Sequence, residues 1–230
     1  DSIGAEMICD SVGEAIAYSS DLTGRKISSD DMGSMVGFRE IQEVEGVVPA
    51  YMELLSKYSL VMGIVKPSLF DVSELAYYYT RDRLDSVPRN EPMPTPREVL
   101  GWVKQTGEVE KYLKIDEDER LSNIAGLMVA ELFPAANVVP SKSIDSEEYV
   151  LRLKPHAKEL LGIITEHQSA YSTGGPENTS SIRDIISSYV GFRLSESPPG
   201  QKPTGEDLLS WLCDTESFKG HLKSLREKNQ

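Results

Sequence analysis

Three consecutive tyrosines stand close to four arginines in this chain, and residues of these two types are suited to binding chemistry. The tyrosines are Tyr77, Tyr78 and Tyr79, and the arginines are Arg81, Arg83, Arg89 and Arg97. Single-stranded nucleic acid binds to aromatic rings that stack on its bases and to cations that pair with its phosphates. Tyrosine and arginine are also enriched in protein interfaces. Three adjacent tyrosines on a helix spread over about 200°, so at least one ring should reach the surface.

Acidic residues interleave with these arginines and weigh against nucleic acid as the ligand. They are Asp82, Asp85, Glu91 and Glu98, and they nearly cancel the local positive charge. A protein interface is the preferred interpretation, and plain packing and contact with RNA or DNA are the alternatives. The candidate partner-binding residues are therefore Tyr77, Tyr78, Arg81, Arg83, Arg89 and Arg97.

No catalytic motif accompanies this cluster. Gly33–Gly37 has a serine between two glycines, but Met32 stands where a nucleophile elbow requires glycine. The two glycines lie about one helical turn apart, which favours close helix approach instead. Neither GxxxxGK[ST] nor GxGxxG occurs in the sequence. We expect no catalytic residue and no cofactor.

The potential metal ligands are scattered. Cys9 and Cys213 belong to no Cys/His cluster, so we expect reduced thiols and a cytoplasmic protein. His156 and His167 would lie about 16 Å apart on a helix and could not share one ion. A half-site of His156 and Glu159, completed by another segment, is the alternative. The sequence therefore predicts no metal site.

Acidic residues are concentrated in the first quarter of the chain. The formal net charge is -13 at pH 7, from 24 Lys and Arg against 37 Asp and Glu. Residues 1–53 hold eleven of the acids and three bases, a net charge of −8. The stretch 219–228 reverses the sign, with Lys219, Lys223, Arg226 and Lys228 against Glu227. This asymmetry favours head-to-tail association of copies or docking onto a basic partner, and ordinary solvated helix faces are the plainer interpretation.

Apolar residues recur at intervals of three and four along most of the chain, which indicates helices. The clearest stretches are 49–65, 121–132 and 182–190. Capping patterns predict further helix starts at Ser68, Thr95 and Thr204, each followed three residues later by an acid. Asp116–Glu119 lack the glycine of a calcium loop and are typical of a helix start, and Pro155 is expected to head another helix. No alternating strand pattern is present, although a short hairpin in the 20s or 130s stays open.

These patterns predict an all-α fold of eight to ten helices in two loosely separated lobes, without a major β-sheet. The segment 86–94 has three prolines in nine residues and cannot be helical. We expect it to be a hinge between an acidic N-terminal helical lobe, 1–85, and a C-terminal helical lobe, 95–230. One continuous domain is the alternative.

The uneven charge and the lack of a catalytic set favour a non-enzymatic structural or assembly protein that binds itself, as a homo-oligomer, or another protein. The first alternative is a viral nucleocapsid or filament coat subunit that binds single-stranded RNA between two helical lobes. Its basis is architectural, because all-helical viral capsid and matrix-type proteins are similar in length and loop-punctuated organisation. The second alternative is an enzyme whose site follows no familiar motif. The longest apolar run, Leu60–Val65, is too short to cross a membrane, so no membrane insertion is expected.

Overall fold

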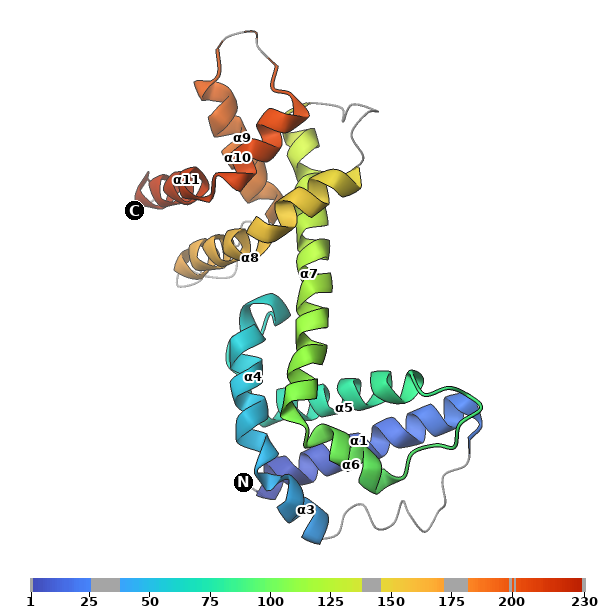
Figure 1. The fold of residues 1–230 in the computed structure, drawn as a ribbon. Coiled ribbons are helices and arrows are strands. Elements are labelled where there is room, and N and C mark those ends of the chain that lie inside the picture. The colour runs from blue at the N-terminus through green and yellow to red at the C-terminus, as the bar shows by residue number, and fades with distance from the viewer. Residues whose placement is uncertain are drawn as a thin grey trace. The chain divides into compact units, whose positions relative to one another are not determined.

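The computed structural model describes residues 2–25, 38–137, 146–171, 182–198, 200 and 202–228 (Figure 1). Within these residues there are ten helices and no strand. The helices are α1 (Ser2–Thr23), α3 (Phe38–Glu45), α4 (Val47–Met62), α5 (Leu69–Asp85), α6 (Pro96–Val103), α7 (Thr106–Ala135), α8 (Ser146–Tyr171), α9 (Ile182–Glu196), α10 (Gly205–Cys213) and α11 (Thr215–Lys228). The predicted all-α fold is confirmed.

Two expectations extend beyond the described residues. Gly33–Gly37, interpreted as a point of close helix approach, lies outside them altogether. The stretches left open for a short hairpin are only partly described. Their described parts form the end of α1, as far as Thr23, and the end of α7, as far as Ala135, each followed by a turn.

The helices divide into two compact units. Unit 1 is Asp1–Glu117 and unit 2 is Asp118–Gln230. The division falls within α7, so the first part of this helix belongs to unit 1 and the rest to unit 2. Segment 86–94 is non-helical, as expected, but the boundary that we placed there is corrected to the middle of α7.

Segment 86–94 joins two helices of the same core. Val99 and Val103 of α6 are buried in one cluster with residues of α1, α4 and α5. Val109 and Leu113, from the first part of α7, are buried in the same cluster. Prolines exclude a helix locally. They do not determine which core the next helix joins, because that depends on where its apolar face finds a partner.

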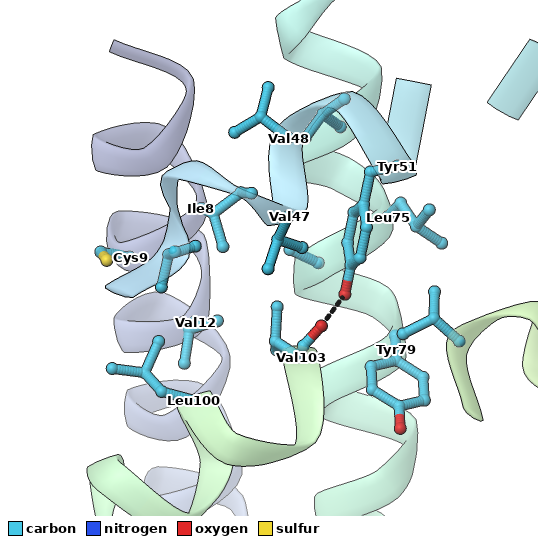
Figure 2. Packing of buried hydrophobic residues seen from close by; sticks show 14 of the residues in the cluster. Ile8, Cys9, Val12, Val47, Val48, Tyr51, Leu75, Tyr79, Leu100 and Val103 are labelled. Atoms are coloured by element: carbon cyan, nitrogen blue, oxygen red, sulfur yellow. Dashed lines mark hydrogen bonds between the residues drawn. The ribbon is translucent and has the colours of Figure 1, made fainter. Parts of the chain in front are cut away.

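α1 and α5 lie side by side in unit 1 and run in the same direction. Near their beginnings, a Cβ added to Gly4 would lie 3.0 Å from side-chain atoms of both Leu69 and Val48, so glycine permits this close approach. Near their ends, Arg25 Nη2 donates a 3.1 Å hydrogen bond to the Val87 carbonyl oxygen. The core between α1, α4, α5 and α6 includes Ile8, Val12, Val47, Tyr51, Leu75 and Val103 (Figure 2).

The core of unit 2 combines the second part of α7 with α8, α9, α10 and α11. Tyr189 of α9 is fully buried there, and its hydroxyl donates a 3.0 Å hydrogen bond to the Trp211 carbonyl oxygen. Its ring meets that of Phe218 edge-on, with centroids 4.9 Å apart. Gly205 begins α10 without a side chain because the Tyr149 hydroxyl occupies the space that a Cβ would need.

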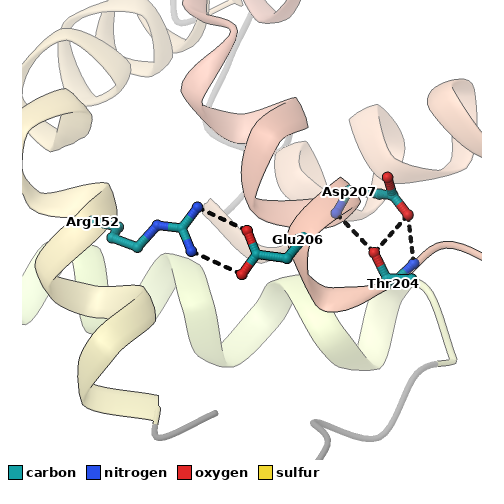
Figure 3. Close-up of polar contacts among 4 residues, drawn as sticks. All are labelled: Arg152, Thr204, Glu206 and Asp207. Carbon is teal, nitrogen blue, oxygen red and sulfur yellow. Dashed lines mark hydrogen bonds and ion pairs between the residues drawn. The ribbon is translucent and has the colours of Figure 1, made fainter.

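Three helices begin with the capping boxes that the sequence predicts. The N-cap residues of α5, α6 and α10 are Ser68, Thr95 and Thr204, and each side chain accepts a hydrogen bond from the backbone N–H three residues later. At α10, Thr204 N in turn donates to Asp207 Oδ2 at 2.8 Å (Figure 3). Such a cap stabilises a helix by about 1 kcal/mol. Arg152 of α8 and Glu206 form a two-bond ion pair beside this cap, with both N–O distances 2.8 Å.

Two of the expected helix starts are wrong. α7 begins at Thr106 and continues through Asp116–Glu119, and α8 begins at Ser146, so that Pro155 lies inside it. No proline interrupts α7 between Gly107 and Phe133. The local sequence does not distinguish acids at the start of a helix from acids on the exposed side of a longer helix, because acidic residues are favourable at both positions.

Replacement of Tyr51 with Phe is expected to lower the free energy of unfolding of unit 1 by about 1 kcal/mol. Tyr51 is fully buried, and its hydroxyl donates a 2.8 Å hydrogen bond to the Val103 carbonyl oxygen at the end of α6 (Figure 2). The last carbonyls of a helix have no partner within it, so the variant leaves a buried acceptor without its donor. Denaturant unfolding followed by circular dichroism measures the change.

Tyr58→Phe is the matched control for this prediction. Tyr58 is 2% exposed, and its buried hydroxyl has no hydrogen-bond partner among the described residues. Removal of that hydroxyl should leave the free energy of unfolding unchanged or raise it, because an unpaired buried polar group is costly. Equal losses in the two variants would show that the Tyr51 hydrogen bond contributes nothing specific.

Candidate protein-interaction surfaces

The six residues selected from the sequence do not form one continuous site. Tyr77, Tyr78, Arg81 and Arg83 lie on α5, Arg97 lies on α6, and Arg89 lies in the loop between these helices. Arg89 and Arg97 are exposed. In the described part of the chain, they share no hydrogen bond, ion pair or ring contact with the four residues of α5. The structure therefore gathers only the α5 residues on one element.

Arg83 is held by aromatic residues of unit 1. Its Nη1 donates a 2.6 Å hydrogen bond to the Tyr79 hydroxyl, and its guanidinium carbon lies 4.4 Å from the centre of the Trp102 ring. Tyr79 is buried, and its ring meets that of Tyr112 edge-on, with centroids 5.4 Å apart. Arg83 thus connects α5 to α6 through its cation–π contact with Trp102, while its hydrogen bond to Tyr79 lies within α5.

Arg81 has a different set of partners. Its Nε and Nη2 donate to Asp82 Oδ1 at 3.1 and 2.9 Å, and its guanidinium carbon lies 5.0 Å from the centre of the Tyr78 ring. The other oxygen of Asp82 accepts a 2.8 Å hydrogen bond from the Tyr112 hydroxyl. Burial, and then this hydrogen bond, raise the pKa of Tyr112 above its ordinary value. Asp82 therefore joins α5 to the first part of α7, a role that the sequence analysis missed.

Tyr78 is the most exposed of the three consecutive tyrosines. Its side chain is 44% exposed, Tyr77 is half-buried, and the two rings meet edge-on with centroids 5.3 Å apart. The expectation that at least one tyrosine reaches the surface is confirmed. Trp102 and Tyr112 complete the network, and no spacing in the sequence connects them to the tyrosine run.

A row of exposed carboxylates follows one face of α1. Glu6, Asp10 and Glu14 are four residues apart and exposed, and we call them the acidic row. Burial, and then the charges of Asp10, Glu40 of α3 and Glu6, raise the pKa of the Cys9 thiol to about 11. Asp10, Glu40 and Glu6 therefore lie close enough to Cys9 for their charges to act on its thiol. None of the acidic row forms an ion pair with another described residue.

A row of exposed cations follows one face of α11. Lys219, Lys223 and Arg226 are exposed at intervals of four and three residues, and we call them the basic row. They line a groove of about 300 Å³ in unit 2. Its other lining residues are Leu222 of the same helix and Ile163, Glu166 and His167 of α8. The basic row forms no ion pair within the described part of the chain.

Two histidines of unit 2 are buried: His167, which lines this groove, and His221 of α11. Burial, and then the charge of Arg226, lower the pKa of His167. Burial also lowers the pKa of His221, with smaller contributions from Lys228 and His167. The His221 ring stacks on Phe192, with centroids 4.7 Å apart. Burial therefore favours the neutral form of both imidazoles in the folded unit.

The remaining sequence hypotheses concern metals and membranes. Among the described residues, no three His, Cys, Asp or Glu side chains are grouped as metal ligands would be. Glu159, considered with His156 as a half-site, accepts a 3.0 Å hydrogen bond from the Thr215 hydroxyl. No described helix is both long enough and apolar enough to span a membrane.

Comparison of the chain with known protein families, with curated proteins and with solved structures gives no match. The activity of the protein must therefore be inferred from its own surfaces: the Tyr78 and Arg81 cluster, the acidic row, the basic row and the groove.

Replacement of Arg83 with Ala is expected to lower the free energy of unfolding of unit 1 by about 1–2 kcal/mol, because the hydrogen bond to Tyr79 and the contact with Trp102 are lost. Arg89→Ala is the matched control, since this exposed arginine makes neither contact, and it should change stability by less than about 0.5 kcal/mol. Chemical denaturation measures both variants. An Arg83→Ala protein as stable as the wild type would show that this arginine is available to a partner instead.

Unit 2 is expected to lose stability as the pH falls from about 7.5 to about 5.5. An unfolded histidine has a pKa of about 6.5. The folded-state pKa values of His167 and His221 are lower, so the unfolded state takes up protons first as the pH falls. The neutral rings contribute their full stability above the pKa of a histidine in the unfolded state. This contribution is lost as the pH falls from there through the lower pKa of the folded state.

Thermal unfolding across this pH range, with the double variant His167→Gln and His221→Gln as comparison, measures the effect. The wild-type melting temperature should fall more steeply with decreasing pH than that of the variant. The same slope in both proteins would assign the pH dependence to carboxylates instead.

Proposed function

We propose that this protein is a non-enzymatic structural or assembly protein that forms homo-oligomers through its charged surfaces. The observation that carries this proposal is the pair of exposed rows of opposite sign, neither of which has an ion-pair partner among the described residues. A cytoplasmic location is part of the proposal, and it is supported by the two unpaired cysteines.

The charge of the two units supports association between copies. Unit 1 has 21 acids against 12 bases, a formal charge of −9, and unit 2 has 16 against 12, a charge of −4. The acidic row therefore lies on the more negative unit and the basic row on the less negative one. Complementary potentials accelerate encounter and select one orientation of the partners.

The expected association is weak and sensitive to salt. Like charges four residues apart on a helix repel each other, and pairing with a row of opposite charge relieves this repulsion. Each exposed ion pair contributes only about 0–1 kcal/mol, so three pairs cannot hold a tight complex at high ionic strength. Dissolved ions screen the attraction between exposed charges, because the Debye length falls from about 30 Å at 0.01 M salt to about 3 Å at 1 M.

A single-stranded RNA-binding coat protein is the second candidate. The basic row, the exposed arginines Arg89 and Arg97 and the exposed ring of Tyr78 favour it. The negative charge of both units weighs against it, because affinity for phosphates grows with the number of cations that contact them. Arg81 and Arg83 also already have partners within unit 1.

The mass in solution should rise with protein concentration at about 0.01 M salt and return towards that of the monomer at about 1 M salt, because screening removes the attraction between the rows. Light scattering across both series, with and without single-stranded RNA, measures this. RNA should leave the mass at low salt unchanged.

Other outcomes decide against the proposal. A monomer at every concentration and salt would exclude self-association. Assembly that appears only after RNA is added, and disappears with salt, would favour the coat-protein candidate.

A further inference from the structure

The groove between α8 and α11 has the chemistry of a receptor for carboxylates. Lys219, Lys223, Arg226 and Glu166 give its lining a formal charge of +2 with neutral histidine. Leu222 and Ile163 add apolar surface. Because the three cations are exposed and form no ion pair within the described residues, no internal contact must break before a ligand binds.

The spacing of the cations suits a helix that carries carboxylates. Residues three or four apart on a helix have their Cβ atoms about 5–6 Å apart. With a rise of about 1.5 Å per residue, the basic row extends over about 10.5 Å and the acidic row over about 12 Å. Each of the three carboxylates in the acidic row can therefore lie opposite one cation.

We propose that the groove between α8 and α11 of one copy receives the acidic row of α1 of a second copy. This inference rests on the proposed function, because it names the contact through which self-association occurs. Charge complementarity selects the occupant: the acidic row is an exposed helix face of the same chain, it has no ion-pair partner among the described residues, and it matches the basic row in length and number of charges.

The contact is heterologous, so it determines the form of the assembly. The two surfaces differ, and a pair of bound copies therefore retains one open groove and one open acidic row. Further copies add at both ends, which produces a ring if the rotation closes and a filament if it does not. Dimers are expected only where one of the two surfaces is blocked.

Charge reversal tests each surface separately. Lys223→Glu reverses the middle of the basic row and Asp10→Lys the middle of the acidic row, and each should weaken association about tenfold or more because like charges are brought together. Lys202→Glu in unit 2 and Glu53→Lys in unit 1 make the same charge changes at exposed positions outside both rows. These two controls should assemble as the wild type does.

A mixing experiment identifies the pairing. The Lys223→Glu protein keeps its acidic row, which fits the intact groove of the Asp10→Lys protein, and the lysine introduced at position 10 of the second protein meets the glutamate introduced at position 223 of the first. An equimolar mixture should therefore recover the assembly that each variant alone has lost. Light scattering and native mass spectrometry at low salt measure this. The chain with both substitutions should recover assembly, because the reversed charge at position 10 of one copy then meets an opposite charge at position 223 of the next.

Each other outcome overturns the inference in a recognisable way. If the wild type assembles but neither charge reversal weakens assembly, the protein self-associates through surfaces other than the two rows. If both single variants are defective but the mixture stays monomeric, the rows do not pair with each other. If the wild type is monomeric at low salt, the proposed function fails as well. Thermal unfolding of each variant, expected to match the wild type, separates these results from misfolding.

Discussion

The burial of one face of α1 is the constraint on which unit 1 depends. The fully buried apolar residues of this face are Ala5, Ile8, Val12, Ala15 and Ile16. Gly4 lets the helix approach α4 and α5 closely. Because an α-helix has 3.6 residues per turn, this burial turns Glu6, Asp10 and Glu14 towards solvent. The acidic row is therefore a direct consequence of core packing.

The same constraint arranges α11 in unit 2. Phe218, His221 and Leu222 are buried, so the neighbouring Lys219 and Lys223 are turned towards solvent. One of the buried side chains is an imidazole, packed on Phe192 and 3.2 Å from the Ser188 hydroxyl. α11 thus contributes buried side chains to the core and exposed cations to the surface. Together with α8 it forms the groove that the basic row lines.

The tyrosine and arginine cluster shows how residues typical of binding can instead be structural. Arg83 lies over Trp102 and bonds to Tyr79, while Asp82 receives hydrogen bonds from Arg81 and Tyr112. A guanidinium group is weakly hydrated and packs well on aromatic faces, so it can occupy a half-buried junction between helices. Composition alone indicates the capacity for such contacts and not whether the partner is internal or external.

The sequence by itself determined what depends on neighbours within a few residues: the all-α class, the capping boxes at Ser68, Thr95 and Thr204, and the non-helical segment 86–94. It also revealed the cations at 219, 223 and 226, whose helical spacing is visible in the chain. Only the tertiary structure decided that the boundary between units lies within α7, that Trp102 and Tyr112 complete the cluster on α5, and that α8 faces the basic row. These features join residues far apart in the chain, and non-directional apolar burial, unlike a local hydrogen bond, leaves no fixed spacing from which to predict them.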